Sequence, residues 1–505
     1  MGFGGRVKPE GILIGGEKMD QQQERLEFYG GKYFAIVPFL VFLIVVAVLS
    51  LMLAINLTAM IGGGIAGLIV GSFFAKDWNK YWQSVQRGFT EQPVGIAFSI
   101  LFVAGIFAML MTVSGLATGL VWLGDAINLT GSAFVAFAFV ASAILALATG
   151  TSLGTVFTMT PILFPAGVIL GGNPLFLAGA ILSGAALGDN MAPVSDTTIL
   201  SAISQKYKNI GGSADVGGVV RTRLKYALLA AIPAFILYLI VGGGSMGDSA
   251  TAATLLAENS NPAALAMLIP IFIVIYIAVK GLGIFKALIY GIVSGAIVGF
   301  ITGLLKPSDF MYVVDGNPMG IITEGVGKMF EGAIILLVII GLLAILKDSG
   351  VVEAFMTGMS KKATSVVKSE LVMLALSTIW CGLSAGVNTI VVAITGPLNG
   401  EIGERYNIHP YRRANITDAT ANTWSYFIPW SAFVFIFILV ADGLKGTYPF
   451  LEVPSMTSFF FAVFYPLFLW VVMLISILTG YGRTFEGKNG EEIKAKDYSP
   501  VDTGM

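Results

Sequence analysis

Long runs of apolar residues recur along most of this chain, separated by short polar stretches. A helix needs about 20 mostly apolar residues to cross a bilayer, so these runs predict membrane helices. The runs do not alternate apolar and polar positions, as the strands of a membrane barrel would. Fourteen candidate runs lie at 33–57, 58–75, 95–115, 130–148, 154–171, 175–190, 226–243, 262–280, 283–304, 330–346, 368–383, 388–400, 425–441 and 457–479. Glycine, proline and hydroxyl residues interrupt four regions, at 130–171, 175–200, 368–400 and 415–432.

The two halves of the chain resemble each other at an offset of 236 residues. Three pairs of equivalent residues are Gly150 and Gly386, Pro161 and Pro397, and Pro193 and Pro429. Each half has seven apolar runs, so the second half starts from the opposite side of the membrane. We therefore predict an all-α polytopic membrane protein with two inverted-topology repeats and interrupted helices, as in many secondary transporters. The regions 130–171 and 368–400 fit re-entrant hairpins as well as crossings, which leaves ten to fourteen membrane segments.

The distribution of lysine and arginine predicts the orientation, because these residues concentrate in cytoplasmic loops. Basic clusters at 6–32, 76–87, 206–225, 361–368, 405–413 and 483–496 each follow an even number of predicted crossings. The segment 244–261 has no basic residue. The predicted parts are a polar cytoplasmic segment (1–32), repeat 1 (33–243), an external linker (244–261), repeat 2 (262–480) and a cytoplasmic tail (481–505). We expect a protein of the inner (plasma) membrane with both termini in the cytoplasm.

Composition narrows the classes of function. Hydrophobic residues make up 56% of the 505 residues and charged residues only 12%, about half of the roughly 25% in soluble proteins. The net charge of −1 excludes the basic field that nucleic-acid binding needs. A single cysteine excludes an internal disulfide, and the single histidine, His409, excludes His-rich metal sites and is expected in a solvated loop. The sequence has no zinc-protease, serine-hydrolase or nucleotide-binding motif, so we expect a transporter without a cofactor rather than an enzyme.

Two segments of the first half carry candidate cation-binding groups. The stretch TGTSLGT (149–155) offers the hydroxyls of Thr151, Ser152 and Thr155 at an interruption where backbone carbonyls can also face an ion. The stretch GDNMAPVSDTT (188–198) places charged and polar residues at membrane depth, where a carboxylate needs a partner, an ion or a proton. Its candidates are Asp189, Asn190, Ser195, Asp196 and Thr197. The alternatives are close helix packing through small residues and, for Asp196, a helix cap.

Matching segments of the second half suggest a substrate site or the other half of the cation site. The stretch 382–397 supplies Ser384, Asn388 and Thr389, and the stretch 415–431 supplies Asp418, Asn422, Thr423, Trp424 and Ser425. Asp418 lies close in sequence to Arg412 and Arg413, so an ion pair at the membrane edge is an alternative for it. The aromatic residues around 424–430 would either close over a substrate or anchor the membrane interface.

These motifs resemble the NhaC-type Na+/H+ antiporter family of the wider ion-transporter superfamily. The segment GDNMAPVSDTT (188–198) is similar to that family's GDK-[ML]-SP-[LV]-SDTT stretch, although Asn190 stands where the family often has lysine. The second hairpin, LSAGVNT (383–389), is poorer in hydroxyls than in many relatives. The resemblance implies two inverted repeats with hairpins, and an ion site that includes Asp189, Ser195, Asp196 and Thr197. A sodium ion would lie near Asp189, Ser152 and Asp196.

Two functions remain open. The first is a Na+/H+ antiporter that works by alternating access, with Na+ and H+ competing for one membrane-embedded aspartate. The second is a Na+-coupled or exchange transporter of a small organic acid or amino acid, which a pocket larger than one ion would favour. The expected partners are the lipid bilayer, a small cation and, under the second hypothesis, an organic solute. A homodimer is compatible with either function, and nucleic acid is excluded.

Overall fold

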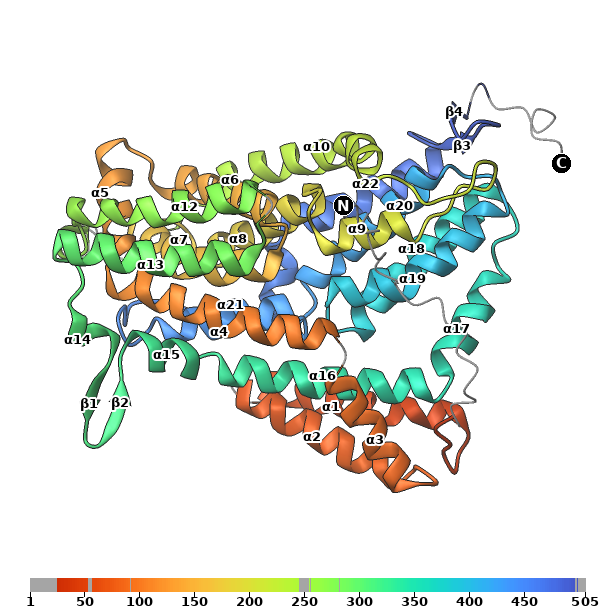
Figure 1. Cartoon of the computed structure of the whole chain (residues 1–505), viewed down its shortest axis with the longest axis horizontal. Helices are drawn as coiled ribbons and strands as arrows, with labels where there is room; N and C mark the ends of the chain where they lie inside the picture. The colour runs from red at the N-terminus through yellow and green to blue at the C-terminus, as the bar shows by residue number, and fades with distance from the viewer. Residues whose placement is uncertain are drawn as a thin grey trace, which may run out of the picture.

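The computed structural model describes residues 25–52, 57–90, 92–244, 254, 256–280, 282–495 and 497. Within these residues helices dominate the structure (Figure 1). The strands found there form two short antiparallel hairpins, β1–β2 (Tyr312–Val314 and Asn317–Met319) and β3–β4 (Thr484–Glu486 and Glu492–Lys494). The predicted all-α class is therefore confirmed.

The helices of the two halves follow one another with short connections. The first half contains η1 (Lys32–Ile36), α1 (Val37–Met52), α2 (Leu57–Ser72), α3 (Trp78–Phe89), α4 (Gln92–Val113), α5 (Leu116–Ala126), α6 (Gly131–Thr149), α7 (Ser152–Ile169), α8 (Pro174–Met191), α9 (Asp196–Ile203) and α10 (Val216–Val241). The second contains η2 (Pro262–Met267), α12 (Leu268–Val279), α13 (Ile284–Thr302), α14 (Pro307–Phe310), α15 (Ile321–Gly327), α16 (Phe330–Asp348), α17 (Val351–Ser360), α18 (Val366–Leu383), α19 (Asn388–Glu404), α20 (Pro410–Ala421), η3 (Trp424–Tyr426), α21 (Ala432–Gly443), η4 (Met456–Phe461) and α22 (Phe464–Thr479).

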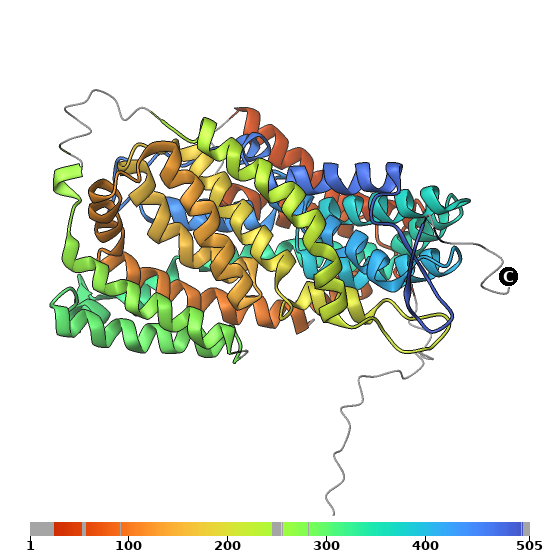
Figure 2. The same cartoon turned by 90° about the horizontal axis from the view of Figure 1, so that it is seen from above.

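Each half contains a helical hairpin whose tip lies inside the protein. In the first hairpin, α6–α7, the N–H of Gly131 donates to the carbonyl of Leu170, so the outer ends of both helices meet. In the second, α18–α19, the hydroxyl of Tyr406 donates to the carbonyl of Ala363 at 2.6 Å. The two hairpins enter from opposite ends of the molecule (Figure 2). They occupy the regions 130–171 and 368–400, where the sequence left hairpins and crossings open.

A glycine in the left-handed conformation shapes each hairpin tip. Gly150 has φ +67°, and a Cβ there would lie 3.0 Å from the backbone nitrogen of Ser195. Gly386 has φ +76°, and its Cβ would lie 2.6 Å from the carbonyl oxygen of Ser425. Side chains disfavour this φ region, and neither position has room for one. Each tip therefore packs directly on the interrupted helix of its own half.

The helix beside each hairpin breaks partway along its length. α8 and α9 are separated by the segment around Pro193 and meet at an angle of 40°, because proline has no N–H for the helical ladder. In the second half Pro429 lies between η3 and α21. Ser431 caps α21 by accepting the N–H of Phe433 at 3.1 Å. The equivalent Ser195 precedes α9 but makes no side-chain cap, because its hydroxyl contacts Asp189.

Element boundaries repeat at the offset seen in the sequence. α7 and α19 begin at residues 152 and 388, α8 and α20 at 174 and 410, and α9 and α21 at 196 and 432, each pair 236 apart. The hairpin and the broken helix thus occur twice, in the same order. The prediction of two repeats with interrupted helices is confirmed.

Among the described residues, fewer helices are long and apolar enough to cross a membrane than the ten to fourteen membrane segments expected from the sequence. Six helices of the described residues are long and apolar enough to span a membrane, or eight if two bent pairs each count as one span. The difference arises because several apolar runs form helices of only 10–17 residues. Three of the six spans, α6, α7 and α18, belong to the hairpins.

The basic segments between residues 76 and 494 that the structure describes gather at one end of the molecule (Figure 1). Hydrogen bonds join the segment 405–413 to 206–209, to 360–363 and, through Asn407, to the β3–β4 hairpin. A bridge joins Gly172, which follows α7, to Gly243, which follows α10. This grouping agrees with the predicted topology, whereas the cytoplasmic identity of the basic end stays a prediction.

Four residues of the basic clusters are buried. Arg223, Arg412 and Arg413 are at most 1% exposed, so they are not solvated charges of a loop. His409 is also buried and forms the N-cap of α20, accepting the N–H of Tyr411 with Nδ1. These side chains fold back into the protein because they find partners there, which hydropathy along the chain does not reveal.

Candidate functional site

Asp189 lies at the centre of a polar cluster between the hairpin tips. It occupies the last turn of α8 and is 2% exposed. Its Oδ1 accepts a hydrogen bond from Ser195 at 2.7 Å, and its Oδ2 accepts from Ser152 at 2.7 Å and Asn388 at 3.1 Å. All three donors are neutral, and the ion pairs among the described residues do not include Asp189. A buried carboxylate without a cationic partner is costly unless it binds a proton or a cation.

The second repeat contributes further oxygens to this cluster. The hydroxyl of Tyr426 lies 2.5 Å from the Ser152 hydroxyl and 3.2 Å from the Asn422 Oδ1. The amide of Asn388 donates to the same Asn422 oxygen at 2.9 Å. The Tyr426 ring stacks on Phe433 with centroids 4.3 Å apart, which holds the hydroxyl in place. The cluster therefore joins both hairpins and both broken helices.

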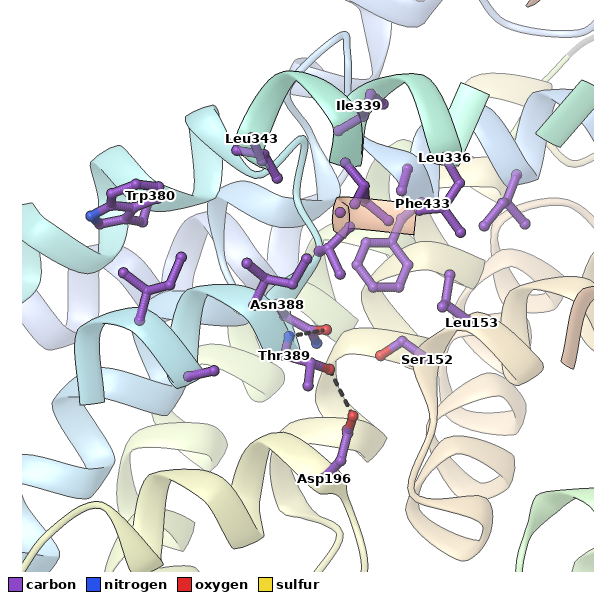
Figure 3. A pocket seen from close by; sticks show the side chains of 18 of the residues that line it. Ser152, Leu153, Asp196, Leu336, Ile339, Leu343, Trp380, Asn388, Thr389 and Phe433 are labelled. Carbon is purple, nitrogen blue, oxygen red and sulfur yellow. Dashed lines mark hydrogen bonds between the residues drawn. The ribbon is translucent and has the colours of Figure 1, made fainter. Parts of the chain in front are cut away.

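Asp196 lies outside the Asp189 cluster. It is the first residue of α9, with Ser195 rather than Asp196 at the N-cap position. Its Oδ1 accepts the N–H of Thr197 at 2.9 Å, and its Oδ2 accepts the hydroxyl of Thr389 at 2.7 Å (Figure 3). The side chain faces a cavity, so Asp196 is the more exposed of the two aspartates.

This cavity has a volume of about 780 Å³ and separates the hairpin tips from α16. Its polar side is formed by the two aspartates and the hairpin-tip residues, and Figure 3 shows Asp196 there with Ser152, Asn388 and Thr389. Its apolar wall comes from α16 and α21 and includes Leu336, Ile339, Leu343, Ile436 and Phe433. Small-molecule sites in proteins usually measure roughly 300–1,000 Å³. The cavity is thus much larger than a single cation requires.

Asp418 forms an ion pair with Arg223 of α10, and both side chains are fully buried. The alternative of a pair with Arg412 or Arg413 is wrong. Arg412 binds Glu370 at 2.8 Å, and Arg413 donates to backbone carbonyls. Asp418 also accepts a hydrogen bond from the amide of Asn422 at 2.9 Å. It is therefore connected to the Asp189 cluster through Asn422.

Several predicted residues do not contact Asp189. Thr155, Thr423 and Ser425 donate their hydroxyls to backbone carbonyl oxygens three or four residues earlier in the chain. Thr151 lines the cavity, and the Ser384 hydroxyl has no partner among the described residues.

Three other candidates form the surroundings of the cluster. Thr197 contacts the hydroxyl of Ser195 at 3.0 Å. Asn190 points to Tyr465, whose hydroxyl it accepts at 3.1 Å. Trp424 packs its ring against Trp470 rather than over the cluster.

The oxygens around Asp189 resemble the ligands of a binding site for a small monovalent cation. The described residues contain no group of three or more His, Cys, Asp or Glu that could hold a metal ion. Around Asp189 the other available oxygens are neutral and come from Ser152, Ser195, Asn422 and Tyr426. Neutral oxygens with one carboxylate suit a hard, singly charged ion. Of the expected sodium neighbours, Ser152 contacts Asp189, whereas Asp196 is directed to Thr389.

Sequence reasoning missed two residues of this site. Tyr426 was treated only as an aromatic residue, although its spacing of four from Asn422 in the sequence would place both on one helix face. Arg223 was read as a loop charge, and no signal in the sequence identifies its burial.

Comparison with known proteins identifies the family. The model of the Na+/H+ antiporter family matches residues 30–243 and again 244–481. The chain belongs to the Na+/H+ antiporter family. The family model thus covers both repeats, and this member is a multi-pass membrane protein and a secondary transporter.

Individual relatives differ in what their names say they transport. A malate-2H+/Na+-lactate antiporter of Bacillus subtilis is 27% identical over 59% of this chain and 66% of its own length. A Na+/H+ antiporter NhaC of Alkalihalophilus pseudofirmus is 22% identical over 72% and 80%. The arginine/ornithine antiporter ArcD of Halobacterium salinarum is 24% identical over 70% and 75%.

Proposed function

We propose that this protein exchanges Na+ for H+ by competition of the two ions for Asp189. The observation that carries the proposal is the surroundings of Asp189, a buried carboxylate with neutral partners from both repeats. A proton and a sodium ion are alternative ways to neutralise such a group. The name of the Alkalihalophilus relative agrees with this activity.

The proposed cycle uses the contacts between the repeats. When Na+ is bound, it takes one Asp189 oxygen together with neutral oxygens such as those of Ser152 and Tyr426. When a proton is bound, the Asp189 carboxyl is itself neutral. Only these two neutral forms pass through the membrane interior cheaply, because an uncompensated carboxylate there is costly. Movement of one part of each repeat against the other would then expose Asp189 to the two sides in turn.

Proton movement in proteoliposomes tests the proposal. The full chain is reconstituted with an imposed pH gradient and an enclosed pH-sensitive dye, and Na+, Li+ or K+ is then added. We expect Na+ to collapse the gradient without any organic solute, and K+ to have little effect. No response to Na+ or Li+ would refute ion exchange as the function.

A second candidate is exchange of a small organic solute with Na+ or H+. The cavity of about 780 Å³ beside Asp189 and Asp196 favours this candidate. Its apolar wall offers no ligand to a bare cation but can pack against an organic solute. Relatives named for malate and lactate, or for arginine and ornithine, agree with a solute of this size. Ile339→Trp would fill part of the cavity from α16 without touching the Asp189 cluster. Solute uptake that falls in this variant, with Na+-driven proton flux retained, would establish the second candidate.

We also propose that the protein lies in the plasma membrane with both termini in the cytoplasm. The reason is that basic residues, which concentrate on the cytoplasmic side, gather at the end formed by 206–209 and 405–413. Single cysteines introduced at Lys208 and Asn261, in a variant without Cys381, should be labelled from opposite sides of the membrane. Labelling from the same side would refute the orientation.

A further inference from the structure

The ion pair between Arg223 and Asp418 is completely buried, at 0% exposure for both side chains. Besides Asp418, the Arg223 Nη1 contacts the carbonyl of Asn190 at 2.5 Å and the hydroxyl of Thr198 at 3.0 Å. Its Nε donates to the Asn415 Oδ1 at 2.9 Å. One guanidinium therefore joins the end of α8, the start of α9 and the middle of α20. Asp189 directly precedes Asn190, so the pair lies one residue from the cluster.

Asp418 holds the nitrogen of the Asn422 amide through both its carboxylate and its backbone carbonyl. The Asn422 Nδ2 donates to the Asp418 Oδ1 at 2.9 Å and to the Asp418 carbonyl at 3.1 Å. An ionised carboxylate only accepts hydrogen bonds, so the amide nitrogen must face it. The Asn422 oxygen is thereby turned toward Asn388 and Tyr426, both of which contact the Asp189 cluster.

The neighbouring amide is fixed in the same direction. The Asn388 Oδ1 accepts the N–H of Thr389 at 3.0 Å, so its Nδ2 faces Asp189 and Asn422. A chain of defined donors and acceptors thus runs from Asp418 through Asn422 and Asn388 to Asp189. In this chain Asn422 is the member whose side-chain oxygen faces the residues of the Asp189 cluster.

We propose that Arg223 and Asp418 are a positioning pair that carries no cargo and keeps the Asn422 oxygen facing the Asp189 site. This inference rests on the proposed cation exchange and assigns the roles of two buried charges within it. Arginine stays protonated in proteins, so Arg223 occupies permanently the place that a transported cation would take at Asp418. The exchange site then has Asp189 as its carboxylate, and Asp418 acts through Asn422.

The decisive variant is Asp418→Asn. Arg223 still needs an acceptor, so the oxygen of the introduced amide would turn to Arg223 and its N–H would point at Asn422. The Asn422 amide would then reverse and present its nitrogen to the cation. We expect the Na+ concentration for half-maximal exchange to rise roughly tenfold or more, the scale of one charge-assisted hydrogen bond, with the maximal rate retained.

Glu370→Gln is the matched control. Glu370 also forms a fully buried pair with an arginine of α20, Arg412, but its hydrogen bonds within the described part of the chain do not reach the Asp189 cluster. This variant makes the same carboxylate-to-amide change and tests any general loss of stability. Half-saturating Na+ should stay within about threefold. A purely structural role for Asp418 would make both variants behave alike.

A double variant, Asp418→Asn with Asn422→Asp, provides a second test if Asp418→Asn alone does not fold. The carboxylate introduced in place of Asn422 would accept from the amide at position 418 and still turn an oxygen toward the Asp189 site, so half-saturating Na+ should fall below that of Asp418→Asn. Unchanged half-saturation in Asp418→Asn, or no recovery in the double variant, would overturn the positioning pair. Absence of Na+-driven proton flux in the unmodified chain would instead refute the proposed function, so the two failures are distinguishable.

Discussion

Replacing Asp189 by asparagine should abolish Na+-driven proton movement and leave the fold intact. The amide keeps the shape of the carboxyl group. Its oxygen can accept from Ser152 and Asn388, and its nitrogen can donate to the hydroxyl oxygen of Ser195. The variant loses the exchangeable proton and one unit of charge. Two unit charges about 4 Å apart at an effective dielectric constant near 20 interact by about 4 kcal/mol. That loss corresponds to roughly a thousandfold weaker Na+ binding.

Asp196→Asn is the matched variant, since it makes the same chemical change seven residues along the chain. Asp196 faces the cavity and, within the described residues, accepts from the Thr389 hydroxyl at 2.7 Å and the Thr197 N–H at 2.9 Å. Losing one charged hydrogen bond costs about 1.5–3 kcal/mol at most, so Na+ affinity should fall by no more than roughly a hundredfold. Exchange should therefore persist at high Na+.

Two measurements separate the variants. Binding of radioactive Na+ to the purified proteins gives affinity, and dye-reported proton flux in liposomes gives exchange. Thermal melting in detergent establishes that each variant is folded. Proton flux in Asp189→Asn within about threefold of the unmodified protein would refute the reasoning about the buried carboxylate. So would complete loss of exchange in Asp196→Asn at saturating Na+.

Three further predictions concern the hairpin tip, the tyrosine and the basic end. Tyr426→Phe keeps the stack on Phe433 but removes the hydroxyl beside Ser152, so half-saturating Na+ should rise roughly tenfold in flux assays without a change in melting temperature. Gly150→Ala should lower the melting temperature more than Gly171→Ala, because both glycines have positive φ but only Gly150 would place a Cβ against a neighbour; equal losses would contradict this packing. Burial lowers the pKa of His409 despite the nearby Glu486 and Glu492. The folded protein then binds fewer protons there than the unfolded chain, and stability should decrease as pH falls below about 6.5. His409→Asn, which retains a cap acceptor, should flatten that slope in melting curves between about pH 5 and 8, and an unchanged slope would exclude His409 as its source.

The sequence predicted the parts of the site that depend on backbone interruptions. Glycine at 150 and proline at 193 mark the hairpin tip and the helix break, and both recur 236 residues later. Polar residues beside such interruptions must face inward or find partners, which is why Asp189, Ser152 and Ser195 could be chosen together. Their mutual contacts follow from the tip packing on the break.

The remainder of the site depends on tertiary packing that local patterns do not encode. Arg223 lies in a basic stretch with the composition of a membrane-flanking loop, yet α10 packs against α20 and brings it to Asp418. Asp196 and Asp189 are alike in the sequence, but the rotation of α9 after Pro193 directs Asp196 to the cavity. The direction of the Asn422 amide is set by a residue of the same helix only because Asp418 has a charged partner from another helix.

The two repeats share a backbone plan but not a set of ligands. At the offset of 236 residues, Asp189 corresponds to Ser425, Ser152 to Asn388 and Asp196 to Ala432. The first repeat therefore brings both carboxylates that face the hairpin tips, and the second brings amides and a tyrosine hydroxyl. A symmetric pair of sites would place two carboxylates beside the same small cluster, and a single Na+ would neutralise only one of them. Divergence of the two halves leaves one buried carboxylate among neutral oxygens, which suits the exchange of one Na+ for protons at a single centre.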